Sequence, residues 1–329
     1  ETEDASGVAA IIVTINGRPL LHDGAPRIAL PPSDDRTRSV AIEVPLVHGT
    51  NKIAVTAVNK AGLQSDPDTV TVTKTVPGPA PPEGNLWIVV VGVSEHSNPR
   101  YSLRYPSVDA RALGEMLKER ADPIYGDVHV RTLTDRESTT PRIKETLGEI
   151  AAQIGKEDLI VVFVAGHGVR TKEGEYFFIT HDGNPARLRE TAFSWQAFED
   201  LLRTMPARGV LLFADTCHSG DIVRPGSRFA GSEEMSENLV KKSGVMVFVS
   251  SQGCEYSLES EAWGHGAFTY ALLEALSGEA NFMKDNVITM AELQLYVPTR
   301  VRTITNNKQH PRIPRLDNFD PEMPLVSAE

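Results

Sequence analysis

The stretch Leu86-Trp-Ile-Val-Val-Val-Gly-Val93 is the longest apolar run in the chain, and it decides the fold class. A strand without polar alternation is typical of a parallel sheet that is covered by helices on both faces. Strand and helix patterns alternate after it, with strands expected at 127–133, 158–165, 210–214 and 245–249, a short hairpin-like segment at 176–179, and helices at 107–121, 140–154, 194–204, 266–277 and 288–304. This alternation predicts an α/β domain with a mostly parallel sheet flanked by helices.

The first 76 residues have a different period. The apolar run 8–15 leads into Asn16-Gly17, a strong signal for a two-residue hairpin turn. Alternating polar and apolar residues follow at 39–44, 51–58 and 69–73, and short strands at this spacing predict a small all-β sandwich that serves as a structural or interaction module. Four prolines between Val76 and Gly84 predict a semi-rigid linker. The expected domains are therefore a β module at 1–76, a linker at 77–85, an α/β domain at 86–305 and a C-terminal extension at 306–329.

Charge and composition narrow the classes of partner. The chain has 329 residues, with 33 Lys and Arg against 44 Asp and Glu, so its net charge is −11. Such a field repels phosphate backbones and anionic lipid, which argues against nucleic acid and membrane partners and favours cationic peptides. The longest apolar run is far shorter than the roughly 20 residues of a membrane-spanning helix. Two cysteines and no visible signal peptide lead us to expect a cytoplasmic protein, of unspecified oligomeric state.

Two polar segments follow neighbouring strands of the predicted sheet. Ala165-Gly-His-Gly168 follows strand 158–165, and Asp215-Thr-Cys-His-Ser-Gly220 follows strand 210–214. The carboxyl ends of parallel strands meet at one edge of a sheet, so we expect His167 and Cys217 to lie close together there. A cysteine nucleophile needs an adjacent base that takes the thiol proton and returns it to a leaving amine. The pair predicts nucleophilic catalysis of peptide hydrolysis.

Other interpretations of these residues compete with this one. A single cysteine is usually a small core residue, and a histidine between glycines is usually a turn residue. His265 lies in a second Gly-His-Gly, but that segment introduces a helix and does not end a strand. His218 points away from the side of its neighbour Cys217, and Cys254 has no strand-end histidine beside it. A zinc site built from Cys217, His218 and His167 lacks the usual ligand spacings.

The two segments resemble the histidine and cysteine loops of the caspase/metacaspase superfamily of cysteine peptidases, and the segment Val249-Ser-Ser-Gln252 fits the same resemblance. The residues before 77 resemble the immunoglobulin-like segment of bacterial caspase-like proteins. The resemblance implies that Cys217 is the nucleophile, that His167 is the general acid and base, and that the N–H groups of Gly168 and Cys217 form the oxyanion hole. It also implies substrate-binding roles for Ser250 and Ser251.

Two aspartates indicate what the enzyme cleaves. Residues i and i+2 of an extended segment share a face, so Asp215 is expected on the side of Cys217, and Asp109 opens the helix that begins at the same sheet edge. Two carboxylates near the thiol favour a cationic substrate side chain. The metacaspase resemblance places the acidic residues of the arginine/lysine pocket at these positions. The alternatives are a helix-dipole role for Asp109 and a bond from Asp215 to a turn amide.

A possible calcium loop is degenerate. Asn281, Asp285 and Glu292 fall at positions 1, 5 and 12 of a calcium-loop template, but Met283 stands where an oxygen ligand belongs. We interpret the segment as the entry to helix 288–304. Many metacaspases are activated by calcium, yet we map no metal site onto this chain and expect no required cofactor.

Together these features predict an α/β caspase-like cysteine endopeptidase that cleaves proteins or peptides after Arg or Lys. The rival is a catalytically silent adaptor, which has no chemical need of the Cys217 and His167 pair. The polar stretch 221–244 is the expected site of self-cleavage, after Arg228, Lys241 or Lys242.

Overall fold

The computed structural model describes residues 2–3, 7–20, 22, 25–31, 37–44, 49–74, 82, 84–218, 245–251, 255, 257–312 and 320–329. The chain divides into two compact units, Glu1–Pro77 and Gly78–Glu329. The division falls within the predicted linker, while the domain borders themselves stay a prediction.

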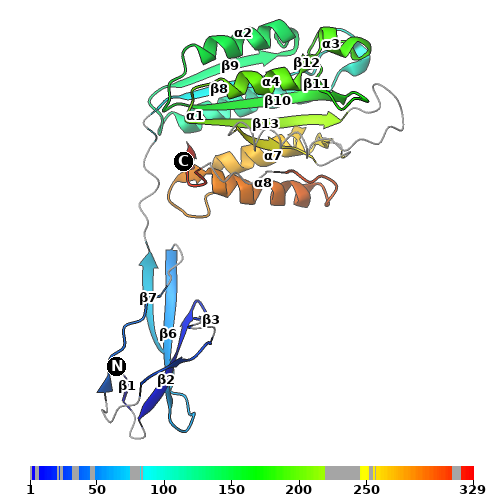
Figure 1. Ribbon diagram of the computed structural model, residues 1–329. Helices are drawn as coiled ribbons and strands as arrows, with labels where there is room; N and C mark the ends of the chain where they lie inside the picture. The colour runs from blue at the N-terminus through cyan, green and yellow to red at the C-terminus, as the bar shows by residue number, and fades with distance from the viewer. Residues whose placement is uncertain are drawn as a thin grey trace. The chain divides into compact units, whose positions relative to one another are not determined.

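The first unit is antiparallel β structure. Its five-stranded sheet has the order β3-β2-β6-β7, with β4 paired to β2 (Figure 1), and β1 pairs separately with β5. The turn after β2 has positive φ at both Asn16 (51°) and Gly17 (79°), as a two-residue hairpin turn of type I′ requires. The expected strand at 39–44 is wrong, because these residues pair with no described strand. The strands are β1 (Thr2–Glu3), β2 (Val8–Ile15), β3 (Arg18–Pro19), β4 (Ile28–Ala29), β5 (Thr37–Arg38), β6 (Gly49–Asn59) and β7 (Asp68–Lys74).

The second unit contains a central sheet in which five strands run parallel, in the spatial order β9, β8, β10, β13, β14. The antiparallel strands β11 and β12 continue the sheet beside the far end of β10. The mixed α/β fold with a mostly parallel sheet is thus confirmed. The strands are β8 (Leu86–Gly92), β9 (Val128–Thr134), β10 (Leu159–Arg170), β11 (Tyr176–Phe178), β12 (Phe193–Ser194), β13 (Gly209–His218) and β14 (Val245–Val249).

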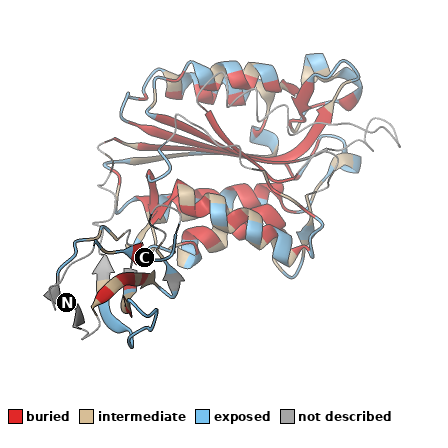
Figure 2. Cartoon of the chain, turned by 60° about the horizontal axis from the view of Figure 1, so that its bottom comes forward, coloured by how far each residue is buried: buried red, intermediate tan, exposed pale blue. Residues whose placement is uncertain are grey.

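Helices cover both faces of this sheet (Figure 1). One core lies between the sheet and α1, α7 and α8, and a second core lies between the sheet and α2 and α4. In Figure 2 the central strands and the inner sides of these helices are coloured as buried, whereas the edge strand β9 is mostly intermediate or exposed. The larger helices are α1 (Pro106–Ala121), α2 (Thr140–Ala151), α4 (Trp195–Arg203), α7 (Ala267–Glu274), which continues into the π-helical η4 (Ala275–Glu279), and α8 (Met290–Ile304).

Short elements complete the unit. The hairpin of β15 (Glu259–Ser260) and β16 (His265–Gly266) leads directly into α7, and β17 (Val287–Thr289) pairs with β18 (Pro324–Ser327). Leu325 and Val326 of β18 are buried in the core beside α1, so residues expected as a C-terminal extension contribute to packing. The remaining short helices are η1 (Pro99–Tyr101), η2 (Asp135–Glu137), η3 (Pro185–Arg187) and α3 (Leu188–Thr191).

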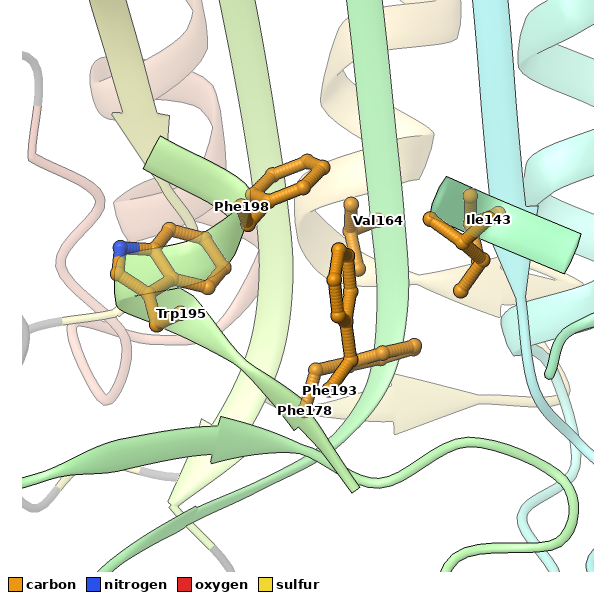
Figure 3. Close-up of a pocket in the computed structure, with 7 residues that line it drawn as sticks. Ile143, Val164, Phe178, Phe193, Trp195 and Phe198 are labelled. Carbon is orange, nitrogen blue, oxygen red and sulfur yellow. The ribbon is translucent and has the colours of Figure 1, made fainter. Parts of the chain in front are cut away.

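The side of the sheet that packs against α2 and α4 holds a small apolar cavity of about 10 Å³, which is room for no more than one water molecule. Figure 3 shows Ile143 and Val164 with the aromatic side chains of Phe178, Phe193, Trp195 and Phe198 around it. No titratable side chain lines this cavity. It is a packing feature of the core and offers no chemistry. In the described part of the chain, no helix is long and apolar enough to cross a membrane.

Candidate active site

Strands β10 and β13 bring the two predicted catalytic residues to adjacent positions. In the parallel register of this pair, His167 lies directly beside Cys217, and Gly168 lies beside His218. Neighbouring strands are separated by about 4.8 Å, so the two backbones are within reach of a side-chain proton transfer. The segment 165–168 is part of β10, which pairs with β13 on one side and, from Gly168 onward, with β11 on the other. Strand β13 likewise continues past Cys217 to His218.

The imidazole of His167 has a defined tautomer. Its Nε2 lies 2.8 Å from the carbonyl oxygen of Tyr101, at the end of η1. Because a carbonyl can only accept, Nε2 carries the proton and the neutral ring has its lone pair on Nδ1. Burial lowers the pKa of His167, against the opposing effect of the Tyr101 hydrogen bond. The ring is therefore neutral at physiological pH and can act as a base through Nδ1.

A second buried histidine, His96, packs beside His167, with the ring centroids 5.4 Å apart. Neither ring nitrogen of His96 has a hydrogen-bond partner among the described residues. Burial, followed by the charge of His167, lowers the pKa of His96 to about 4. No motif in the sequence marks His96, although it follows strand β8 at the same end of the sheet.

Asp109 and Asp215 converge on one side of this edge. Asp109 is buried in the first turn of α1, where its Oδ1 accepts from His265 Nδ1 at 2.6 Å and its Oδ2 from the N–H of Gly266 at 3.1 Å. Asp215 is buried on β13, where its Oδ2 accepts from the hydroxyl of Thr269 at 3.4 Å. A Cβ placed on Gly266 would lie 3.1 Å from Asp215 Oδ2 and 3.2 Å from Asp109 Oδ2. Both carboxylates therefore pack closely against the backbone of Gly266, and any larger residue there would collide with them.

The surroundings disfavour the charged form of both carboxyl groups. Burial and the charge of Asp109 raise the pKa of Asp215 to about 6. Burial also raises the pKa of Asp109, although the hydrogen bond from His265 opposes that effect. Oδ1 of Asp215 is buried and has no hydrogen-bond partner among the described residues. A buried anion with few donors and a like charge beside it costs free energy, and a cationic group placed here would relieve that cost.

Glu259 is a third carboxylate near this pair and was not among the predicted site residues. It lies directly opposite Gly266 in the β15–β16 hairpin, and residues opposite one another in an antiparallel pair share a face. The residue as a whole is exposed, but its carboxyl lies in a partly desolvated place, and burial together with the charges of Asp215 and Asp109 raises its pKa to about 7. No spacing rule identifies Glu259, because its position depends on the hairpin pairing.

Ser250 and Ser251, predicted to bind substrate, follow β14 and are both buried. The hydroxyl of Ser250 lies 2.5 Å from that of Ser257, and its carbonyl accepts from the side chain of Gln309 at 2.8 Å. The hydroxyls of Ser257 and Ser250 favour the charged form of Asp215, so both serines lie near the acidic pair. The segment is fixed in place beside the acidic pair, and a substrate-binding role for it stays a prediction.

Gly168, predicted as an oxyanion-hole residue, has a structural reason to be glycine. A Cβ there would lie 1.6 Å from the hydroxyl oxygen of Tyr176, which is hydrogen-bonded to Thr216 Oγ1 at 2.8 Å. The side chain of Tyr176 thus fills the space beside Gly168. The hydroxyl of Tyr176 ties β11 to β13 immediately before Cys217.

Two further predictions concern the self-cleavage sites and the calcium-like segment. The suggested self-cleavage sites Arg228, Lys241 and Lys242 lie outside the described residues. In the calcium-like segment, Glu292 accepts from Met283 N at 3.1 Å and from Thr289 N at 2.9 Å, and it forms the capping box at the start of α8. One of its oxygens thus caps α8 and the other binds the backbone of the segment before it, and among the described residues no group of three or more His, Cys, Asp or Glu could hold a metal ion.

Known proteins resemble this chain in two ways. A family model described as "Caspase domain" matches residues 86–320. Among solved structures, protein GSU0716 from Geobacter sulfurreducens matches with a TM-score of 0.51 and 17% identity, over 74% of this chain and 97% of that one. Caspase-1 from Spodoptera frugiperda matches with a TM-score of 0.46 and 16% identity, over 74% and 92%. The likeness to the Geobacter protein shows a shared fold, and no curated protein matches the chain.

Proposed function

Because this chain belongs to the caspase domain family, whose members are cysteine peptidases, we propose that it hydrolyses peptide bonds after Arg or Lys, with Cys217 as nucleophile and His167 as general acid and base. The observation that carries this proposal is the β10–β13 register, which pairs His167 with Cys217 two residues beyond the buried Asp215. A thiol nucleophile, a base and a binding site for a cationic side chain thus meet at one sheet edge.

The proposed reaction starts with proton transfer. Nδ1 of His167 accepts the proton of the Cys217 thiol, and the thiolate attacks the carbonyl carbon of the scissile bond. The negative charge that develops on the carbonyl oxygen is stabilised by the N–H groups of Gly168 and Cys217. The His167 imidazolium then protonates the leaving amine, and a thioester remains on Cys217.

Hydrolysis of the thioester completes the cycle. His167, neutral again, removes a proton from a water molecule, which attacks the thioester carbon and releases the new carboxyl terminus and the thiol. The hydrogen bond from Nε2 to the Tyr101 carbonyl supports these steps, because it keeps Nδ1 as the proton-accepting atom throughout. No carboxylate is needed to orient the ring, so the proposed mechanism uses a dyad.

The acidic pair supports the proposed preference for Arg or Lys. Asp109 and Asp215 are both buried, and no lysine or arginine is bonded to either among the described residues. A guanidinium or ammonium group from a substrate would neutralise the pair, whereas an acidic side chain would add a further negative charge. The same preference would direct self-processing to the bonds after Arg228, Lys241 or Lys242.

The proposal is tested by hydrolysis of matched peptides that differ only at the residue before the scissile bond. Wild type is expected to cleave after Arg and Lys and not after Asp. Cys217→Ala and His167→Ala should each abolish turnover while circular dichroism and the unfolding midpoint stay close to wild type. Near wild-type hydrolysis by Cys217→Ala, or equal cleavage after Asp, would overturn the proposal.

A further inference from the structure

His265 is the one imidazole that is bonded to the acidic pair among the described residues. Its Nδ1 lies 2.6 Å from Asp109 Oδ1, and its side chain is 20% exposed. The next residue, Gly266, donates its N–H to the other oxygen of the same carboxylate at 3.1 Å. Strand β16 therefore binds both oxygens of Asp109, and these two bonds fix the plane of the carboxylate.

Asp215 is held very differently. It is 7% exposed, its Oδ2 accepts one long hydrogen bond from Thr269 at 3.4 Å, and its Oδ1 has no hydrogen-bond partner in the described part of the chain. The nearby hydroxyls of Ser257 and Ser250 favour its charged form, but burial and Asp109 outweigh them. A buried carboxylate oxygen without a donor is rare and points to a partner that arrives with the ligand. The two aspartates are thus chemically unequal although they lie side by side.

Gly266 lets the two carboxylates lie close together. A Cβ on this residue would lie 3.1 Å from Asp215 Oδ2 and 3.2 Å from Asp109 Oδ2, closer than almost all real Cβ contacts, so both carboxylates pack against its backbone. If His265 did not bind it, the carboxylate of Asp109 could rotate toward Asp215, and the two negative charges would repel each other more strongly. The contact to His265 prevents this rotation.

We propose that His265 is a positioning residue of the specificity pocket, which holds Asp109 so that Oδ1 of Asp215 remains the direct acceptor for the cationic group of the substrate. This inference rests on the proposed function, since it assigns unequal roles within the same pocket. Asp215 binds the cation directly, Asp109 acts through its charge, and His265 acts through Asp109. His265 takes no part in proton transfer to or from Cys217.

Three substitutions of His265 separate positioning from folding. In asparagine the side-chain nitrogen is the same number of bonds from Cα as Nδ1 of histidine, so His265→Asn can donate to Asp109. In His265→Gln the nitrogen lies one bond further out, and His265→Ala has no donor. We expect His265→Ala to raise KM for an Arg peptide roughly tenfold, the loss expected for a hydrogen bond to a charged group, with kcat within about twofold of wild type. His265→Asn should recover most of this loss, and His265→Gln should recover less.

A binding measurement keeps this test independent of catalysis. Calorimetry with agmatine, which carries a guanidinium group, is done on Cys217→Ala protein with each further substitution. We expect affinity to fall roughly tenfold with His265→Ala, to return with His265→Asn, and to fall more with Asp215→Asn than with Asp109→Asn. If agmatine follows this order but no peptide is cleaved, the peptidase proposal fails and the positioning role stands. If wild type cleaves after Arg while His265→Ala leaves KM and agmatine affinity unchanged, or lowers kcat alone, the positioning role is wrong.

Discussion

Asp158 and Asp215 lie at opposite ends of the parallel strands of one sheet, and they are almost equally buried, at 6% and 7% exposure. Asp158, just before β10, accepts hydrogen bonds from Asn85 N, Trp87 Nε1 and Gly155 N at 2.8–2.9 Å. Burial acts to raise its pKa, but these bonds together lower it below the ordinary value. For Asp215, burial and the neighbouring carboxylate of Asp109 raise the pKa to about 6.

The difference separates an anion that the fold supplies with donors from one that it leaves short of them, which supports the proposed role of Asp215 in binding a cation. The fold surrounds Asp158 with donors, so its charge stabilises the native state. The fold gives Asp215 a second negative charge as neighbour and leaves one oxygen without a donor, so its charge destabilises the native state until a cation binds. At the carboxyl end of the sheet the buried acidic pair therefore lowers the stability of the native state, as expected if a cation binds there.

The largest expected effect is on catalysis. Asp215→Asn removes the carboxylate that we propose binds the substrate cation, a loss of roughly 2–5 kcal/mol by analogy with charge pairs at interfaces, or about thirtyfold to several thousandfold in kcat/KM. The measurement is steady-state hydrolysis of an Arg peptide, with Asp158→Asn as the matched control at the other edge. Comparable activity losses in the two variants would remove the functional distinction between the aspartates.

The next effect is on stability, and its sign should differ between the two variants. Asp158→Asn loses charge-assisted hydrogen bonds and should lower the free energy of unfolding by roughly 2–4 kcal/mol at pH 7. Asp215→Asn removes a carboxyl whose folded-state pKa lies above its unfolded value, and should raise that free energy by about 2–3 kcal/mol at pH 7. Urea denaturation measures both.

The pH dependence of the stability gained by Asp215→Asn provides a check on its cause. Stability is lost in wild type as pH rises from about 4 to 6, because the folded state must release a proton that it binds more tightly than the unfolded state does. The advantage of Asp215→Asn should therefore shrink as pH falls toward 4. A destabilised Asp215→Asn protein would contradict the account of an unsatisfied anion.

The smallest expected effect is a change in the pH profile of kcat/KM when Glu259 is replaced. Attraction of the substrate cation requires ionised carboxyls, so kcat/KM for Arg peptides should fall as pH decreases through the pKa values of Glu259, about 7, and Asp215, about 6. The loss should reach roughly tenfold per pH unit below that range for one essential group. Because burial lowers the pKa of His167, its protonation should contribute only at lower pH. Glu259→Gln should remove the upper part of this fall, and an unchanged profile in that variant would assign the fall to another group.

The fold could be predicted from the sequence where the hydrophobic pattern of a single strand or helix was enough to identify it. The apolar runs of β8, β10, β13 and β14 and the alternating helices were found, because buried parallel strands and amphipathic helices have distinct periods. The strand expected at 39–44 failed, since alternation alone does not say whether a partner strand is available. The extension of β10 through His167 was missed, because it depends on the return of β11 to pair with it.

The candidate site was predictable only in part. His167, Cys217, Asp109 and Asp215 were selected because they stand at strand ends or at the start of a helix, where topology decides proximity. Glu259 and the contact of His265 with Asp109 were not found, because both depend on a hairpin that is inserted before α7 and is folded back on the sheet edge.

The central claim is that Cys217 is a nucleophile served by a pocket for basic side chains, and covalent labelling tests it most directly. Wild type, His167→Ala and Asp215→Asn proteins are treated with a peptidyl-Arg chloromethylketone and with its peptidyl-Asp counterpart, and the labelled peptide is identified by mass spectrometry. The account predicts rapid labelling of Cys217 by the Arg reagent in wild type alone, with slow labelling in both variants and by the Asp reagent. Labelling of Cys254 in place of Cys217, or equal rates with the two reagents, would contradict it.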